Sequence, residues 1–406
     1  MEWTVRRSDY LKQLHDSKDA TGVVKVITGM RRCGKSTLME QFIEDLRSEG
    51  VSDDHIFHVN FETFEGYDLI PSEELRSRLR NLPTNGIVYI LLDEIQNVKG
   101  WETIVSSLEE ARNFDVYFSG SNSDMLSTDL STHLSGRYIE IMMLPLSFKE
   151  YLELHPGDRE DRFVQYLRYG GLPDTDPDRG DKHNMGYLEG VFNTVLVKDM
   201  LSRLKTDDVN RIRAIARFLY SNIGNVTNIA SIAKGTGINP GTVERYVEGM
   251  ESALLFYHAE RYDIVGKKLL STNGKFYASD LGMRMMALKG SGTDDLSRPL
   301  ENAVFLELIR RGYTVRTSSY RDKEVDFTAI TGNKVEYYQV AMTILSEETR
   351  NREFGSLESI RDNFPKTVLT MDRFNLGTFE GIKVVNVVDW MLGAERRDEA
   401  IYHPLG

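Results

Sequence analysis

The chain has 406 residues, of which 40% are hydrophobic and 28% charged, and its formal net charge is −12 at pH 7. This length accommodates about three domains, and no apolar run approaches the length that crosses a membrane. The single cysteine excludes an internal disulfide and any metal site built from several cysteines. The N-terminal sequence MEWTVRRSDYLKQL has no apolar segment after its basic residues, so we expect a cytoplasmic protein.

A strand, a glycine-rich loop and a helix are predicted near the N-terminus. Val23–Thr28 is a short β-branched run, Gly29–Ser36 reads GMRRCGKS, and Thr37–Leu46 carries apolar residues at helical spacing. In this context a glycine, four free positions and Gly-Lys-Ser form a phosphate-binding loop. Its backbone N–H groups and the helix N-terminus hold phosphates, because both favour negative charge. The sequence therefore predicts ATP binding, and a simple glycine turn with an exposed lysine is the alternative.

The loop predicts roles for individual side chains. We expect Lys35 to contact the β- and γ-phosphates and Ser36 to ligate Mg²⁺. Cys33 lies beside Lys35 at a helix N-terminus, a setting that lowers a thiol pKa, so we expect its alkylation to block ATP binding and bound nucleotide to protect it. The predicted nucleotide-binding residues are Gly29, Met30, Arg31, Arg32, Cys33, Gly34, Lys35, Ser36 and Thr37.

A second strand is predicted at Ile87–Leu92 (IVYILL), and Asp93 and Glu94 follow it. A continuous apolar run is typical of a buried parallel strand, which delivers these carboxylates at its C-terminal edge. We expect Asp93 to hold Mg²⁺, directly or through water, and Glu94 to orient the water that attacks the γ-phosphate. Acidic residues also end strands as solvated caps, but the glycine loop favours the catalytic interpretation.

Two further candidates follow along the chain. Ser119 and Ser121 follow the strand candidate Val116–Phe118, and either could sense the γ-phosphate or hold the attacking water. We prefer Ser121 over Ser119. An ordinary turn explains the same residues. Arg137 precedes another strand candidate, Tyr138–Met143. An arginine at this point can act as a finger on a nucleotide bound by a neighbouring subunit. The alternative is a surface salt bridge.

Motifs follow one another along nearly the whole chain: GMRRCGKST, LLDEIQNVKGWE, FSGSNSDMLS, LSGRYIEIMMLPLSFKEYL and YGGLP, then KFYASDLGM, LENAVFLELIRRGY, EVDF and YYQVA. Together they resemble a prokaryotic family of AAA+-type ATPases whose ATPase module is followed by a C-terminal domain of unknown function. The resemblance implies an ATPase that works as a homo-oligomer, with Arg137 directed at the adjacent subunit's nucleotide. Cys33 stands where the family commonly has an aliphatic residue.

Breaks in composition predict the domain organisation. Residues 1–150 alternate strand and helix signals, which indicates an α/β fold with the parallel sheet of a P-loop NTPase of the AAA+/ASCE type. Residues 151–205 are predicted to form a helical lid and linker, because a turn-rich stretch interrupts their helices. We assign residues 206–285 to a winged-helix domain and residues 286–406 to an α/β domain that resembles restriction endonucleases.

The winged-helix prediction depends on three helices, at Arg211–Asn222, Ile229–Gly235 and Gly241–Leu255, and on a β-like segment after them. Three glutamates lie on the third helix, which would read DNA: Glu244, Glu248 and Glu251. They repel phosphates, and the pI of about 5.3 lies well below that of typical nucleic-acid binders. We therefore favour a packing or interdomain role for this helix over DNA reading.

The C-terminal region resembles a nuclease core in which a helix glutamate, a strand aspartate and an acid-x-lysine strand bind a metal ion. Glu301 begins an amphipathic helix and Asp326 lies in a strand candidate, but Gln339 and Ala341 replace the acid and the lysine. Lys323 and Lys334 are candidates for a migrated lysine. We expect a degenerate nuclease fold used for binding, without nuclease activity.

Two functions from different classes remain. The first is a Mg²⁺-dependent ATPase that couples hydrolysis to rearrangement of its C-terminal domains, acting on a protein client. The second is a nucleotide-gated interaction or regulatory module with negligible turnover, associated with nucleic acid or protein. Glu94 favours the first, because a module that only binds nucleotide does not need a positioned base.

Overall fold

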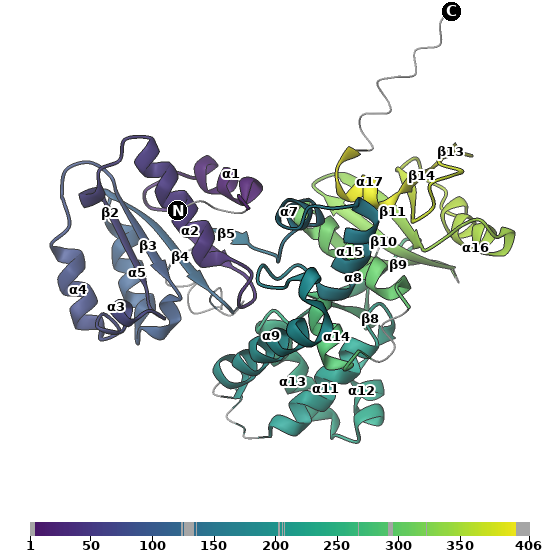
Figure 1. The fold of residues 1–406 in the computed structure, drawn as a ribbon, viewed down its shortest axis with the longest axis horizontal. Coiled ribbons are helices and arrows are strands. Elements are labelled where there is room, and N and C mark those ends of the chain that lie inside the picture. The colour runs from purple at the N-terminus through teal and green to yellow at the C-terminus, as the bar shows by residue number, and fades with distance from the viewer. Residues whose placement is uncertain are drawn as a thin grey trace, which may run out of the picture. The chain divides into compact units, whose positions relative to one another are not determined.

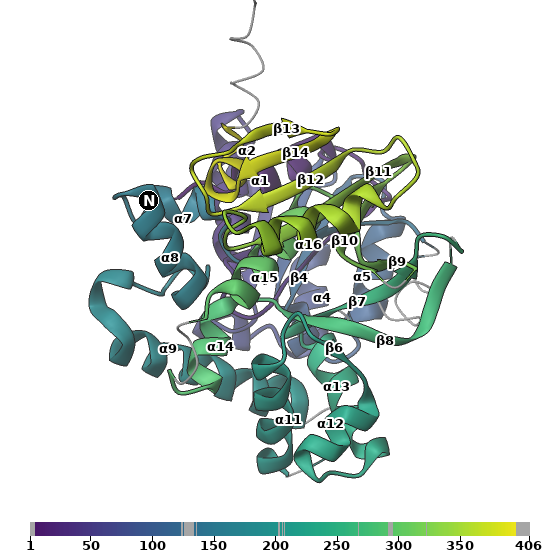
Figure 2. The same cartoon turned by 90° about the vertical axis from the view of Figure 1, so that its right-hand side faces the viewer.

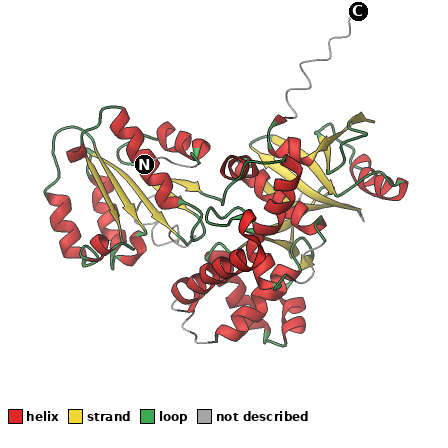
Figure 3. Ribbon diagram, in the orientation of Figure 1, coloured by secondary structure: helices red, strands yellow, loops and turns green. Residues whose placement is uncertain are grey.

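The computed structural model describes residues 5–122, 125, 134, 136–201, 204, 206, 208–266, 268–290, 295–321 and 323–394. Parts of two motifs, at 123–124, 126–127 and 135, lie outside these residues. The described residues form two compact units: the first ends at Pro145 and also contains Ser252–Leu254, and the second begins at Leu146 and contains the rest. Each unit has a β-sheet of its own, with helices packed around it (Figures 1 and 3).

The first unit alternates helices and strands, as the sequence predicts. Its helices are α1 (Ser8–Asp16), α2 (Lys35–Ser48), α3 (Phe64–Tyr67), α4 (Ser72–Arg80) and α5 (Trp101–Glu110), with short 3₁₀ turns at Asp53–His55 and Ile95–Asn97. Its strands are β1 (Val24–Thr28), β2 (Ile56–Asn60), β3 (Val88–Asp93), β4 (Phe114–Gly120) and β5 (Tyr138–Met142).

All five strands of this unit are parallel, in the order β2-β3-β4-β1-β5. β1 and β3 are buried at every position, as expected of apolar strands that are covered on both faces. Because parallel strands end at one edge of the sheet, the glycine loop after β1 and the carboxylates after β3 meet there. Only β4 separates them. This arrangement confirms the predicted α/β fold class.

The core of the first unit lies between this sheet and α4 and α5. Trp101 and Ile104 of α5 pack with Leu75 of α4 against Val116 and Phe118 of β4. Trp101 meets Phe118 edge to face, with ring centroids 5.4 Å apart. This packing fixes β3 and β4, and therefore the edge at which they end.

The second unit begins with helices and continues into a mixed sheet. Its helices are α7 (Phe148–Leu154), α8 (Arg159–Tyr169), α9 (Gly180–Thr194), α11 (Val209–Ser221), α12 (Ile229–Thr236), α13 (Pro240–Ser252), α14 (Leu281–Ala287), α15 (Ser297–Arg310), α16 (Glu347–Glu358) and α17 (Val387–Met391), with a 3₁₀ turn at Pro177–Arg179 and a π-helical turn at Val195–Leu201. Its strands are β6 (Val226–Thr227), β7 (Phe256–Asp263), β8 (Lys268–Ala278), β9 (Thr314–Tyr320), β10 (Lys323–Thr331), β11 (Lys334–Ala341), β12 (Lys366–Thr370), β13 (Gly377–Phe379) and β14 (Ile382–Asn386).

These nine strands form one sheet, in the order β13-β14-β12-β11-β10-β9-β7-β8-β6. The three predicted helices are present as α11, α12 and α13, and the β-like segment after them is β7, which pairs with β8 in a hairpin. Figure 2 shows the three helices gathered beside the β6 end of the sheet. β7 pairs with β9, so the hairpin of the predicted winged helix and the strands of the predicted nuclease-like region share one sheet. The sequence did not predict this continuity. The winged-helix, lid and domain-boundary assignments stay predictions.

Among the described residues, no helix is both long and apolar enough to cross a lipid bilayer.

Candidate nucleotide-binding site

The glycine loop has the backbone geometry that an anion site needs. Gly34 is left-handed, with φ of 103°, and α2 begins at the next residue, Lys35. Because Gly34 has no side chain, no capping group competes with an anion for the first amides of α2. A Cβ atom at Gly29 would lie 2.5 Å from the carbonyl oxygen of Met143, so only glycine allows this close approach. The loop therefore fits a phosphate group, which its N–H groups would bind.

Lys35 points into this loop and toward the end of β3. Its Nζ lies 3.0 Å from the carbonyl oxygen of Gly29 and 3.3 Å from a carboxylate oxygen of Glu94. Burial lowers the lysine pKa, but Glu94 and Asp93 outweigh it, and the pKa of Lys35 lies above its ordinary value. The side chain is therefore a permanent cation at the position predicted for it.

Asp93 ends β3 and is fully buried. Asn60 at the end of β2 donates a hydrogen bond of 2.7 Å to one of its oxygens, and the Ser119 hydroxyl on β4 donates to the other. Burial raises the pKa of Asp93, and hydrogen bonds from Ser119 and Ser36 oppose the rise. Ser36 and Asp93 thus lie in contact, and their oxygen atoms are the ligand type that Mg²⁺ prefers.

Glu94 has an unusual backbone conformation. Its φ of 55° and ψ of 46° lie in the left-handed region, which a residue with a Cβ atom seldom adopts. Burial disfavours its charged form, but Lys35 and Arg31 outweigh burial, and the pKa of Glu94 lies below its ordinary value. The side chain is therefore an ionised carboxylate in a buried site.

Two serines complete the site: Ser119 lies on β4, and Ser121 directly follows that strand. Ser121 donates to Glu94 at 3.3 Å, and Ser119 accepts the Glu94 N–H at 3.1 Å in addition to bonding Asp93. Both serines are fully buried. The structure therefore brings together Lys35, Asp93, Glu94 and Ser121, and Ser119 makes the more extensive contacts of the two serines.

The sequence analysis missed two side chains that contact the carboxylates. Asn60 bonds Asp93, and the Gln96 amide donates to Glu94 from the 3₁₀ turn that follows it. For Asn60 a signal existed, because a polar residue ends a strand candidate that precedes a loop. No comparable signal distinguished Gln96.

The expectation for Cys33 is wrong. Its thiol is fully buried, and its Sγ lies 2.8 Å from the position that a Cβ atom on Gly29 would occupy. Burial raises the thiol pKa and outweighs the lowering effects of Lys35 and Arg7. The side chain therefore packs inside the protein, against Gly29. We now expect alkylation of Cys33 to be slow with or without nucleotide.

Comparison with known proteins agrees with this geometry. A family model described as an AAA domain matches residues 22–152, and a domain of unknown function matches residues 160–294. An "Uncharacterized protein" of Haemophilus influenzae is 37% identical over 401 residues, which are 96% of this chain and 98% of that protein. The chain contains an AAA domain and belongs to the same family as this relative. A second relative, an uncharacterized protein of Methanocaldococcus jannaschii, is 29% identical and covers 90% of this chain and 85% of its own length.

Solved structures are similar to this chain at lower levels of identity. The ORC1 protein of Aeropyrum pernix in complex with DNA has 12% identity and a TM-score of 0.29, over 70% of this chain and 92% of that one. DnaA from Aquifex aeolicus bound to AMPPCP has 15% identity and a TM-score of 0.30, over 62% of this chain and 89% of that one.

Arg137 forms an ion pair within its own chain. Its guanidinium lies 2.9 Å from a Glu109 carboxylate oxygen on α5. The arginine side chain is 53% exposed and that of Glu109 only 1%. The contact corresponds to the salt-bridge alternative, while about half of the arginine side chain stays exposed.

A second polar cluster lies in the second unit, where the nuclease-like motif was predicted. The structure brings Glu301, Asp326 and Gln339 together: the Asp326 N–H donates to the Gln339 side chain at 3.0 Å, and a lysine joins both carboxylates. That lysine is Lys275 of β8, with Nζ 2.9 Å from Glu301 and 4.0 Å from Asp326. Lys323, suggested from the sequence, bonds the Gly355 carbonyl oxygen instead.

Lys275 gives this cluster an internal cation. It also contacts Glu324 at 2.6 Å, and these carboxylates raise its pKa despite its burial, so it stays charged. Among the described residues, no three histidine, cysteine, aspartate or glutamate side chains are arranged to hold a metal ion. The donor set therefore suits an internal ion pair better than a catalytic metal. The sequence included Lys275 in a motif but predicted no role for it.

Proposed function

We propose that this AAA+ protein binds ATP with Mg²⁺ and hydrolyses it. One observation carries the proposal: a buried, ionised Glu94 lies 3.3 Å from Lys35 and directly follows Asp93. The groups that we assign as cation, metal ligand and base thus lie together at one edge of the sheet, beside the glycine loop.

The side chains of this edge have separate tasks in the proposed reaction. The loop amides and Lys35 bind the β- and γ-phosphates and neutralise their charge. Ser36 and Asp93 would hold Mg²⁺, which supplies positive charge to the phosphate oxygens. Glu94 accepts a proton from the attacking water and orients it, with its carboxylate fixed by Ser121 and Gln96.

The alternative function, a nucleotide-gated module with negligible turnover, makes no use of Glu94. The strained backbone at Glu94 has a cost, since left-handed conformations disfavour residues with a Cβ atom by about 1–2 kcal/mol. Such strain is found at functional sites, where it places a side chain for reaction. This observation favours hydrolysis over binding alone.

We further propose that the active form is a homo-oligomer and that Arg137 acts on the nucleotide of a neighbouring subunit. The exposure of about half of its side chain supports a contact with another chain, and a finger stabilises the transition-state charge on phosphate. Glu109 would hold the arginine in place between turnovers.

The second unit is proposed to bind a protein client and to rearrange during the ATPase cycle. Glu244 and Glu248 are exposed on α13, so the helix that would read DNA presents negative charge. The Lys275 cluster supports a binding role over a metal-dependent nuclease.

Measurement of phosphate release tests this function. Purified protein is incubated with ATP and either Mg²⁺ or EDTA, and phosphate is followed with time. The proposal expects steady release that requires Mg²⁺. A protein that binds labelled ATP but releases phosphate no faster than buffer would support the nucleotide-gated alternative.

A further inference from the structure

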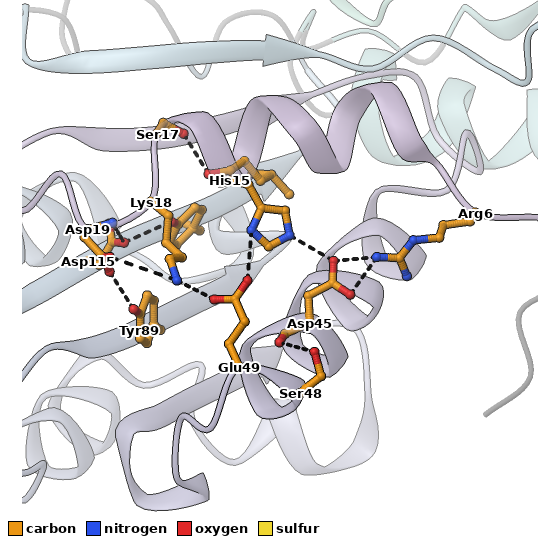
Figure 4. Close-up of polar contacts among 12 residues, drawn as sticks. Arg6, His15, Ser17, Lys18, Asp19, Asp45, Ser48, Glu49, Tyr89 and Asp115 are labelled. Atoms are coloured by element: carbon orange, nitrogen blue, oxygen red, sulfur yellow. Dashed lines mark hydrogen bonds and ion pairs between the residues drawn. The ribbon is translucent and has the colours of Figure 1, made fainter.

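The N-terminal segment, which lies before the matched AAA domain at residues 22–152, runs along α2. Figure 4 shows His15 of α1 between Asp45 and Glu49, at 2.9 Å and 3.5 Å, and Arg6 bonded to Asp45 at 2.6 Å. Lys18 forms an ion pair with Glu49. These contacts attach the segment to the C-terminal half of the helix whose other end is the phosphate-binding loop.

Arg7 connects this segment to the loop itself. Its side chain is buried, and its two terminal nitrogens donate hydrogen bonds of 2.9 Å each, one to the carbonyl oxygen of Cys33 and one to that of Leu144. Its backbone N–H donates to the Gln41 side chain on α2 at 3.1 Å. A planar guanidinium with several donors can hold two carbonyl groups at once, which the single ammonium of a lysine does less well.

Leu144 belongs to the segment through which the chain leaves the first unit. β5 ends at Met142, and the unit ends at Pro145. The Met143 N–H donates to the Thr28 carbonyl oxygen at 2.7 Å, and the Leu144 N–H donates to the Tyr10 hydroxyl at 3.0 Å. The exit segment therefore touches the start of the loop directly, at Gly29 and Thr28, and reaches Cys33 through Arg7.

The position of the Cys33 carbonyl determines the direction of the next amide. The Cys33 C=O and the Gly34 N–H belong to one planar trans peptide group, in which they point in opposite directions. The hydrogen bond turns the Cys33 carbonyl toward the Arg7 guanidinium, so the Gly34 N–H is directed away from that guanidinium. The proposed function assigns the loop amides to phosphate binding. The Gly34 amide is therefore a phosphate-binding group that Arg7, a residue outside the matched AAA domain, orients.

We propose that Arg7 is a positioning residue for the phosphate-binding loop and that it couples the loop to the exit segment at residues 143–145. The inference rests on the proposed nucleotide binding. It adds a path along the chain by which the effect of bound nucleotide leaves the first unit, through the segment 143–145. When phosphate binds, the Gly34 peptide is fixed more firmly, and the Cys33 carbonyl passes this constraint through the guanidinium to Leu144.

The test compares wild type with Arg7→Gln, Arg7→Lys and the matched control Lys12→Ala. Lys12 carries the same charge and lies on α1, which begins directly after Arg7, but its side chain is exposed. Two quantities are measured: the affinity for fluorescent MgADP, and hydrogen exchange of the Leu144 amide with and without MgADP. We expect Arg7→Gln to bind MgADP on the order of tenfold more weakly, since it loses charge-assisted hydrogen bonds. MgADP should slow exchange at Leu144 in wild type and Lys12→Ala only.

Arg7→Lys should give intermediate affinity, and it replaces Arg7→Gln as the deciding variant if the latter does not fold. Equal MgADP affinity and equal nucleotide-dependent protection of Leu144 in the Arg7 variants and the control would overturn the inference. If wild type binds no MgADP, the proposed function fails instead. The connection between the loop and Leu144 is then tested without nucleotide. Faster hydrogen exchange of both the loop amides and the Leu144 amide in Arg7→Gln than in wild type supports this connection. Unchanged exchange refutes it.

Discussion

The ammonium of Lys35 lies 3.3 Å from the carboxylate of Glu94, and both side chains are nearly inaccessible to solvent. The group proposed to bind phosphate and the group proposed to orient water therefore form an ion pair with each other. A bound phosphate competes with Glu94 for Lys35, because both are anions. Binding of ATP would thereby release Glu94 for its role as base.

Replacing Ser119 with alanine should weaken the site without disrupting the loop. The hydroxyl donates to Asp93 and accepts the Glu94 N–H, and leaving a buried donor unpaired costs about 1–3 kcal/mol. We expect a higher Mg²⁺ concentration for half-maximal phosphate release and a lower melting temperature. Ser107→Ala, on the exposed face of α5, is the control. Unchanged Mg²⁺ dependence in Ser119→Ala would show that this hydroxyl does not support Asp93.

Replacing Arg137 with alanine should separate binding from turnover. An arginine finger contributes about 10³-fold or more to phosphoryl transfer. Arg137→Ala should therefore bind ATP normally and hydrolyse it far more slowly. The control Arg112→Ala, at an exposed position, should hydrolyse ATP at the wild-type rate. Mixing Arg137→Ala with Lys35→Ala should restore some activity, because an intact pocket meets an intact finger. The idea is contradicted if hydrolysis per chain is independent of protein concentration and the mixture shows no rescue. Arg137 would then serve only as the salt-bridge partner of Glu109.

Replacing Lys275 with methionine should destabilise the second unit. The substitution leaves Glu301 and Asp326 without their buried cation, and breaking a buried ion pair from one side costs about 3–5 kcal/mol. Chemical denaturation followed by hydrogen exchange in β8 and β10 measures the effect, with the exposed Lys268→Met as the control. If Lys275→Met is as stable as Lys268→Met, the lysine is not the internal counter-ion of this cluster.

Glu251 on α13 should make stability depend on pH. Burial and the neighbouring Glu248 raise its pKa from 4.5 to about 7. The folded state thus holds this proton more tightly than the unfolded state, and the stabilisation it provides is lost as pH rises from about 4.5 through 7. Glu251→Gln should reduce this loss and melt at a higher temperature than wild type at pH 8. Parallel melting curves for the two proteins from pH 5 to 8 would contradict the assignment.

The first unit was the part that sequence could predict, because its signals are local. The β-branched run before Gly29 and the apolar run before Asp93 each predict a buried strand, and parallel strands bring their ends together. Asn60 and Gln96 could not be predicted in the same way. Their contacts depend on how neighbouring strands and turns lie in space.

Two outcomes depended on tertiary packing that no local pattern records. Cys33 was expected to be reactive because its neighbours in sequence are basic, but its side chain turns toward Gly29 and burial dominates its pKa. Lys275 lies far from Glu301 and Asp326 along the chain, and only the pairing of β7 with β9 makes the hairpin and the nuclease-like strands one sheet. The sequence therefore did not point to Lys275, and Lys323, one of its two candidates, bonds the Gly355 carbonyl oxygen instead.

The most direct test of the account compares Glu94→Gln with Lys35→Ala in paired assays of MgATP binding and phosphate release. Glu94→Gln keeps the phosphate-binding groups and removes the base, so it should bind MgATP at least as tightly as wild type and release almost no phosphate. Lys35→Ala removes the phosphate-binding cation and should lose binding itself. Phosphate release by Glu94→Gln at the wild-type rate would contradict the central claim that this chain hydrolyses ATP with Glu94 as its base.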